Sequence, residues 1–149
     1  MANSDEESTI TNSGDAVWAG KQREVIQAYL QSQGCDHAGV SLEPRWFLSP
    51  YLAIWAIRSK ANPDAVGWWA ISGDVPTDYM TAAQDIRSAA DVLAAFGRQW
   101  SQSAESMSRG EHVGIGKPEN VRELAPLLRI RAGMLQKLSD QVRDEESEG

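Results

Sequence analysis

Two neighbouring segments of the chain are apolar at almost every position, and they restrict its possible folds more than any other feature. The segments are YLAIWAIRS (Tyr51–Ser59) and AVGWWAISG (Ala65–Gly73), both rich in aromatic and β-branched residues. The intervening segment contains a turn-forming Asn-Pro-Asp sequence at 62–64. We therefore predict two antiparallel strands joined as a hairpin.

Both faces of this predicted hairpin are apolar. Side chains alternate between the two faces of a strand, so Trp55 and Ile54 point in opposite directions, as do the adjacent Trp68 and Trp69. A two-stranded ribbon that is apolar on both sides is not stable in water. Either helices cover both faces, or one face meets another chain.

The rest of the chain supplies helices for this purpose. Apolar residues recur at helical spacing in three regions. The first is 16–33, the second runs from a capping box at Ser88 and Asp91 to about Gly110, and the third is 119–143. Pro126 interrupts the third region, so we expect a short helix before it and a longer one after it. The predicted fold class is α+β: a small antiparallel β-hairpin or three-stranded sheet packed by three to four helices.

The length and the charge distribution predict a single domain between acidic tails. Of the 149 residues, 1–14 and 144–149 contain seven acidic residues and no Lys or Arg, which accounts for the whole net charge of −7. We predict disordered acidic tails over these two ranges and a single α+β domain over 15–143. Nucleic-acid binding is not expected, because there is no basic tract.

Neither a membrane location nor a bound cofactor is expected. The chain has no apolar run long enough to span a bilayer and no secretory signal, which favours a cytoplasmic protein. Cys35 is the only cysteine, and the two histidines, His37 and His112, are far apart in the sequence. This spacing matches no common zinc pattern, so we predict no metal and no cofactor.

The most distinctive polar residues follow the second strand in the segment SGDVPTDY. Asp74, Thr77, Asp78 and Tyr79 lie within six residues, at a strand end, where connecting loops tend to carry function. Two nearby carboxylates can share acid and base roles, and a phenol can donate to a developing oxyanion. The alternative is that both aspartates hold the turn and that Tyr79 is half-buried. The candidate catalytic residues are Asp74, Asp78 and Tyr79.

Most of the six Trp residues are expected in the core, but the adjacent Trp68 and Trp69 must point to opposite faces, so at least one could line a pocket or a partner surface. Trp46 lies in RWFLSPY, just before the hairpin. If one apolar face is open, we expect it between this segment and the Trp68 or Trp69 face. The candidate binding residues are Trp46, Trp68, Trp69, Asp74, Thr77, Asp78 and Tyr79.

Several of these segments together resemble a known family. WFLSPYLAIWAI, VGWWAISGDVPTDY and PENVRELAPLLRIRAGMLQ are similar to a family of small bacterial proteins known only as a domain of unknown function. The resemblance spans about Trp18 to Leu138, and the GDxPTDY turn is its most specific element. It implies a bacterial, soluble, cytoplasmic protein and no assigned activity.

Three functions remain open from the sequence. The first is a non-enzymatic protein-binding module, such as an immunity-type protein or a regulatory partner. The second is a small enzyme with a carboxylate and tyrosine site at the GDVPTDY turn. The third is a homo-oligomeric structural protein that uses the apolar hairpin as its interface. We favour the first, with a protein partner or a homodimer as the expected assembly.

Overall fold

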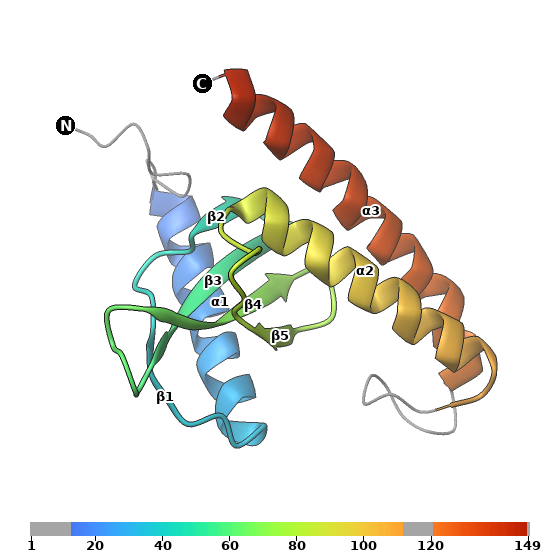
Figure 1. Ribbon diagram of the computed structural model, residues 1–149, viewed down its shortest axis with the longest axis horizontal. Coiled ribbons are helices and arrows are strands. Elements are labelled where there is room, and N and C mark those ends of the chain that lie inside the picture. Colours follow the sequence, from blue (N-terminus) through green and yellow to red (C-terminus); the bar gives the residue numbers. More distant parts are fainter. Residues whose placement is uncertain (1–12, 112–120, 149) are drawn as a thin grey trace. The chain divides into compact units, whose positions relative to one another are not determined.

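A computed structural model describes residues 13–111 and 121–148, and it divides the chain into two compact units. Unit 1 is Met1–Ala83 and unit 2 is Gln84–Gly149 (Figure 1). Unit 1 contains the sheet and unit 2 is helical, and the single α+β domain over 15–143 stays a prediction. Most of the predicted N-terminal tail lies outside the described residues.

Unit 1 contains one helix and a five-stranded antiparallel sheet. Its elements are α1 (Ser13–Ser32), β1 (His37–Val40), β2 (Trp46–Leu48), β3 (Leu52–Ser59), β4 (Val66–Gly73) and β5 (Asp78–Thr81). The strand order is β1-β3-β4-β5, and β2 also pairs with β3. With the two helices of unit 2, this confirms the α+β fold class.

The predicted hairpin is the centre of the sheet. Strands β3 and β4 pair with Leu52 opposite Gly73 and with Trp55 opposite Ala70. The sheet exceeds the predicted two or three strands because β1 and β2 together cover the other edge of β3. These strands are only four and three residues long, too short to show an alternating pattern.

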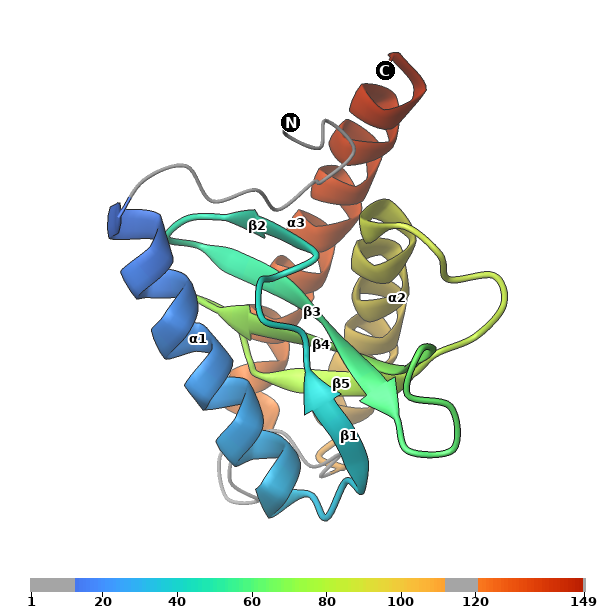
Figure 2. The ribbon, with the colours of Figure 1, turned by 90° about the vertical axis from the view of Figure 1, so that its left-hand side faces the viewer.

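Helix α1 packs on one face of this sheet, as Figure 2 shows. Its buried residues Ala19, Ile26 and Leu30 form a core with Trp55 and Ile57 of β3. The indole Nε1 of Trp55 donates to the buried Ser72 Oγ at 3.1 Å, which satisfies both polar groups inside the apolar layer. The helix ends at Ser32, before Gly34, which adopts a φ of 71° as predicted for a helix-ending glycine.

Unit 2 is a pair of antiparallel helices, α2 (Ala89–Ser108) and α3 (Val121–Glu148). Ser88 and Asp91 form the predicted capping box at the start of α2. Burial would raise the pKa of Asp91, but hydrogen bonds from the Arg87 and Ser88 backbone N–H groups and from the Arg143 guanidinium lower it below its ordinary value. Asp91 therefore joins the start of α2 to the end of α3.

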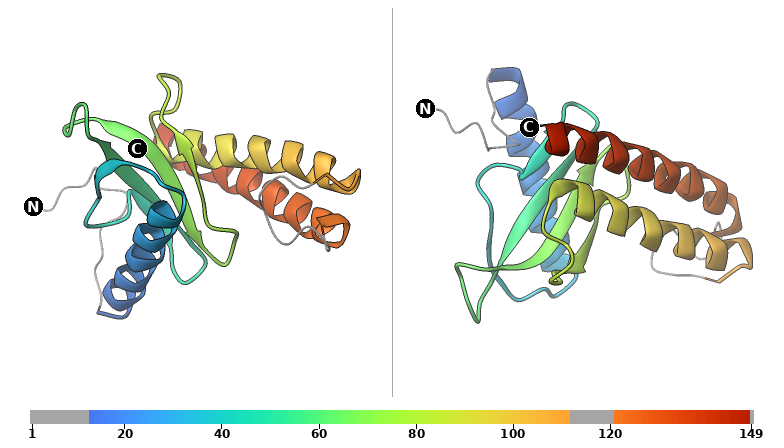
Figure 3. Two further views of the ribbon diagram at one scale, coloured as in Figure 1. Left: turned by 90° about the horizontal axis from the view of Figure 1, so that it is seen from below. Right: turned by 45° about the horizontal axis from the view of Figure 1, so that its top comes forward.

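Each of the two helices has a stripe of buried residues with alternating steps of three and four, the spacing of a coiled-coil seam. In α2 the stripe is Ala90, Leu93, Gly97, Trp100, Ala104 and Met107, and Ala89, Val92, Ala95 and Phe96 are buried beside it. In α3 the stripe is Val121, Ala125, Leu128, Ala132, Leu135, Ser139 and Val142. Figure 3 shows the two helices side by side along their length. Large and small side chains alternate along both stripes, which allows the two surfaces to interdigitate.

Small residues in this seam allow α3 side chains to reach the backbone of α2. Ser139 Oγ donates to the Ala90 carbonyl at 2.7 Å, and Gln136 Nε2 donates to the Ala94 carbonyl at 3.2 Å. A Cβ atom at Gly97 would lie 2.8 Å from Gln136 Nε2. Gly97 therefore leaves the space that the Gln136 side chain occupies.

Two sequence expectations for α3 differ from the structure. The break at Pro126 is absent, because α3 is continuous from Val121 and contains Pro126 near its start. A proline there costs one early backbone hydrogen bond, while Ala125 and Leu128 on either side remain buried in the seam. The helix also continues to Glu148, whereas the sequence predicts a disordered tail from Asp144. Among the described helices, none combines the length and the apolar composition needed to cross a bilayer.

The seam predicts opposite effects for alanine at two helical glycines. Gly133 has no atom near the position of an added Cβ, so Gly133→Ala should raise the free energy of unfolding by about 1 kcal/mol. Gly97→Ala should lack this gain, because the new methyl group displaces Gln136. Urea denaturation of both variants tests this difference. In a Gln136→Ala background, Gly97→Ala should raise the free energy of unfolding as Gly133→Ala does. An equal gain from Gly97→Ala with and without Gln136 would contradict the packing of Gln136 against Gly97.

Candidate functional site

The GDVPTDY segment is part strand and part turn. Gly73 ends β4, residues 74–77 form the turn, and Asp78 and Tyr79 begin β5. Strand β5 pairs with β4, placing Asp78 opposite Ile71 and Tyr79 opposite Ala70. The four polar candidates therefore do not share one loop, because two of them belong to the sheet.

Gly73 brings this turn against the turn between β2 and β3. Its φ is 127°, and an added Cβ would overlap the Tyr51 carbonyl oxygen and lie 2.6 Å from Leu52 Cα. The backbone N–H of Asp74 donates to that same Tyr51 carbonyl at 2.6 Å. Glycine is thus required twice at this position, by the backbone conformation and by the close approach.

Asp74 and its neighbours form an exposed surface at this end of the sheet. Its carboxylate makes no hydrogen bond or ion pair with any residue that the structure describes. Tyr51 is 56% exposed and Leu48 is 41% exposed, and Pro50 between them is also exposed. We call Leu48, Pro50, Tyr51 and Asp74 the turn surface.

Asp78 has a different environment from Asp74. Its carboxylate accepts the backbone N–H of Tyr79 at 2.8 Å and a hydrogen bond from the Tyr29 hydroxyl of α1. Burial, the charge of Asp78, the neighbouring Tyr79 and this hydrogen bond together raise the pKa of Tyr29 from 10.0 to about 12. Asp78 therefore connects β5 to α1, a structural role.

Tyr79 also joins α1 to the sheet. Its ring meets the Tyr29 ring edge to face, with centroids 5.7 Å apart, and it packs half-buried against the core of unit 1. Thr77 is half-buried in the turn. Within the 74–79 segment, Asp74 is exposed and the other five residues are half-buried.

The three candidate tryptophans do not gather into one open aromatic face. Trp68 packs against the core beneath α1, whereas Trp69 points to the opposite face and is 3% exposed. The Arg45 guanidinium lies 5.2 Å from the centre of the Trp69 ring. Trp46 is half-buried in β2, opposite Ile54. Trp46 and Trp69 thus lie on the face opposite α1, where Arg45 covers the Trp69 ring.

The other reactive side chains have structural surroundings. His37 Nδ1 accepts the Gly39 backbone N–H at 2.9 Å. Burial and then the Asp36 charge raise the pKa of the Cys35 thiol, which disfavours the reactive thiolate. Among the described residues, no three His, Cys, Asp or Glu side chains are grouped so that they could hold a metal ion. His112 lies outside the described residues.

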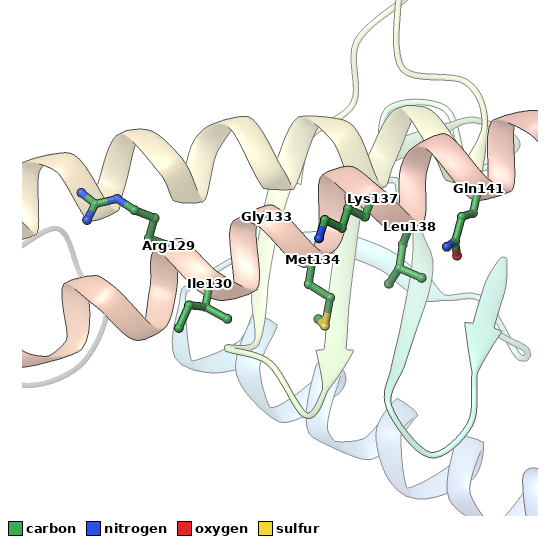
Figure 4. Close-up of a pocket in the computed structure, with 7 residues that line it drawn as sticks. All are labelled: Arg129, Ile130, Gly133, Met134, Lys137, Leu138 and Gln141. Atoms are coloured by element: carbon green, nitrogen blue, oxygen red, sulfur yellow. The ribbon is translucent and has the colours of Figure 1, made fainter.

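A second surface, which the sequence analysis does not assign to a site, lies along α3. Ile130, Met134 and Leu138 extend from the same side of this helix between Arg129 and Gln141, and they line a groove of about 450 Å³ (Figure 4). Ile130 is 62% exposed. The sequence carried one sign of this surface. Ile130 and Met134 widen the apolar stripe of the helical region over 119–143, beside the residues of the seam.

Comparison with known families identifies the chain. The model of a family described as a domain of unknown function (DUF4826) matches residues 12–146. The chain belongs to this family. The DUF4826 match confirms the resemblance to an uncharacterised family and extends slightly beyond the predicted Trp18–Leu138. No curated protein and no solved structure shows significant similarity to the chain.

The environments of the two aspartates predict different effects on Tyr29. Asp78→Asn should lower the pKa of Tyr29 from about 12, because the charge and its hydrogen bond are weakened while burial remains. Asp74→Asn should leave that pKa unchanged. An ultraviolet titration of tyrosinate in both variants, with Tyr29→Phe to assign the signal, measures the difference.

The contact between Tyr29 and Asp78 predicts a loss of stability at high pH. The folded-state pKa of Tyr29 lies above its ordinary value of 10.0, so its contribution to stability is complete below pH 10. That contribution should be lost as the pH rises towards 12, and Tyr29→Phe should remove this part of the pH dependence. An unchanged pH dependence in Tyr29→Phe would show that Tyr29 is not the group responsible.

The close approach at Gly73 predicts a large loss of stability for a small substitution. Gly73→Ala should lower the free energy of unfolding by at least about 2 kcal/mol, through strain and the loss of the Asp74 to Tyr51 bond. Gly20→Ala is a matched control on α1, where an added Cβ meets nothing. Thermal unfolding of the two variants should separate them clearly, and a harmless Gly73→Ala would argue against the packing of the two turns.

Proposed function

We propose that this DUF4826 protein is a non-enzymatic protein-binding module of the bacterial cytoplasm, acting as an immunity-type or regulatory partner. Its binding site in this proposal is the turn surface, Leu48, Pro50, Tyr51 and Asp74. The supporting observation is the Asp74 N–H to Tyr51 carbonyl bond, which holds exposed apolar side chains beside an exposed carboxylate.

The turn surface has the properties that recognition of a protein requires. It lies on two turns anchored to central strands, so little conformational entropy is lost when a partner binds. Exposed Tyr is a frequent interface residue because it offers a large contact area with few rotatable bonds. Asp74 would select a partner that places Lys or Arg beside apolar side chains.

The two other functions considered from the sequence have less support. An enzyme at the GDVPTDY turn needs both carboxylates, and the Asp78 carboxylate is bonded to Tyr29 and to the Tyr79 N–H. A homo-oligomer formed through the hairpin needs an open apolar face, and α1 already packs on one of its faces. Self-association remains an outcome of the test below.

Affinity capture with matched variants tests the proposed binding surface. The tagged full chain should retain a partner from its own cell extract, and Leu48→Ser with Tyr51→Ser should lose it. Leu42→Ser, which alters a side chain that is 79% exposed on another loop, should retain it. Thermal unfolding of each variant first establishes that it is folded.

Two results would contradict the proposal. Capture that is unaffected by the double variant would place any partner elsewhere on the chain. A dimer of the purified chain that dissociates in the double variant, as measured by light scattering, would assign the turn surface to self-association. Asp74→Ala should weaken capture without loss of stability, because its carboxylate has no partner among the described residues.

A further inference from the structure

A cavity of about 330 Å³ lies at the opposite end of the β3–β4 hairpin from the turn surface. It is lined by Ser41, Arg45, Ala56, Arg58 and residues 63–66. The first two belong to the connection between β1 and β2, and the others to β3, the hairpin loop and the start of β4. All of these residues belong to unit 1.

Backbone hydrogen bonds explain why a cavity forms here. The connection between β1 and β2 is anchored at both ends to β3, by Ser41 N–H to the Ala56 carbonyl at 2.9 Å and by Arg45 N–H to the Ile54 carbonyl at 2.7 Å. Arg23 of α1 also donates to the Ser41 carbonyl at 2.9 Å. The walls are therefore held by the sheet and by α1, while the small Ala56 side chain leaves space between them.

The cavity carries an excess of positive charge. Arg45 and Arg58 contribute two guanidinium groups, and Asp64 is the one acidic residue among the lining side chains. In the part of the chain that the structure describes, neither Arg forms an ion pair. The position of Arg45 over the Trp69 ring restricts its motion and leaves its N–H donors available.

A buried hydroxyl in the same cavity has no partner. Ser41 Oγ is inaccessible to solvent and makes no hydrogen bond, although Ser41 lines the cavity. The Nε1 atom of Trp69, whose ring lies beside Arg45, is also buried and unpaired. Buried polar groups are nearly always hydrogen-bonded, as Trp55 and Ser72 are on the other face of this sheet. The Ser41 hydroxyl therefore has an unused donor in the wall of a cavity that two Arg residues also line.

We propose that this cavity binds the oxyanion group of a small anionic molecule, held by Arg45 and Arg58 and accepting a hydrogen bond from Ser41 Oγ. Guanidinium groups present paired N–H donors that match the oxygens of a phosphate or a carboxylate. Both ligand types share this chemistry. The proposal is independent of the turn surface, because none of its residues belongs to that surface.

Calorimetric titration of the full chain with inorganic phosphate and, separately, with citrate tests this site. Each titration is compared with sodium chloride at the same ionic strength, so that general charge screening is removed. At least one probe should bind saturably, and the tighter probe identifies the phosphate or the carboxylate as the preferred group. Failure of both probes to bind saturably overturns the proposal.

Two substitutions in the cavity and one control outside it locate the bound anion. Arg58→Gln and Arg45→Gln should each weaken binding by about tenfold or more, because each removes a charge-assisted hydrogen bond. Arg98→Gln, an exposed Arg on α2 with the same change in charge, should leave the affinity unchanged. Equal weakening in all three variants would show that net charge, and not this cavity, determines binding.

Ser41→Ala provides a readout that a purely structural role would not give. The variant should weaken anion binding while the melting temperature of the free protein does not fall, since the hydroxyl has no partner to lose. If Ser41→Ala leaves affinity unchanged, Ser41 does not contact the anion and the proposed geometry is overturned. These results do not depend on protein capture, so failure here is distinguishable from failure of the turn surface.

Discussion

The close approach of Gly73 to the backbone at Tyr51 and Leu52 determines much of unit 1. Leu52 stands opposite Gly73, so this contact and the Asp74 N–H to Tyr51 carbonyl bond set the register at one end of the central hairpin. A shift of one residue would move each side chain of a strand to the other face. In the observed register, Trp55 reaches Ser72 beneath α1, while Trp69 lies on the opposite face beside Arg45.

The same contact separates the roles of the two aspartates. Asp74 follows Gly73 directly and is held by its backbone, which leaves the carboxylate to solvent. Asp78 begins the next strand, where its carboxylate binds the Tyr29 hydroxyl of α1. A pair of acidic residues that resembles a catalytic site in the sequence is therefore one structural and one exposed group. This division is the main support for a binding function over an enzymatic one.

The sequence predicted the regular elements well and their polar connections poorly. The periodic helices, the capping box at Ser88 and the two apolar strands have local patterns that propensity and periodicity detect. Strands β1, β2 and β5 have three or four residues and exist because β3 and β4 offer edges for pairing. The continuity of α3 through Pro126 likewise depends on its packing against α2. The short strands and the continuous α3 all depend on contacts between residues that are far apart in the sequence.

The candidate sites were hard to predict for the same reason, because their residues are far apart in the sequence. The bond between Tyr29 and Asp78 joins residues far apart in the chain, and no spacing rule connects them. The cavity of Arg45 and Arg58 likewise depends on pairing between distant strands. Arg58, a charge at the end of an otherwise apolar strand, was the available signal. Pattern reading finds groups that lie close in sequence, whereas both of these sites are assembled by the sheet.

The free energy of unfolding of Asp78→Ala beside Asp74→Ala tests the central claim most directly. The account predicts that Asp78→Ala loses about 1 to 3 kcal/mol, because it removes an acceptor from the half-buried Tyr29 hydroxyl and the Tyr79 N–H. It predicts that Asp74→Ala stays within about 0.5 kcal/mol of the parent. Equal losses, or a larger loss for Asp74→Ala, would contradict the division of the two carboxylates into a structural and an exposed group.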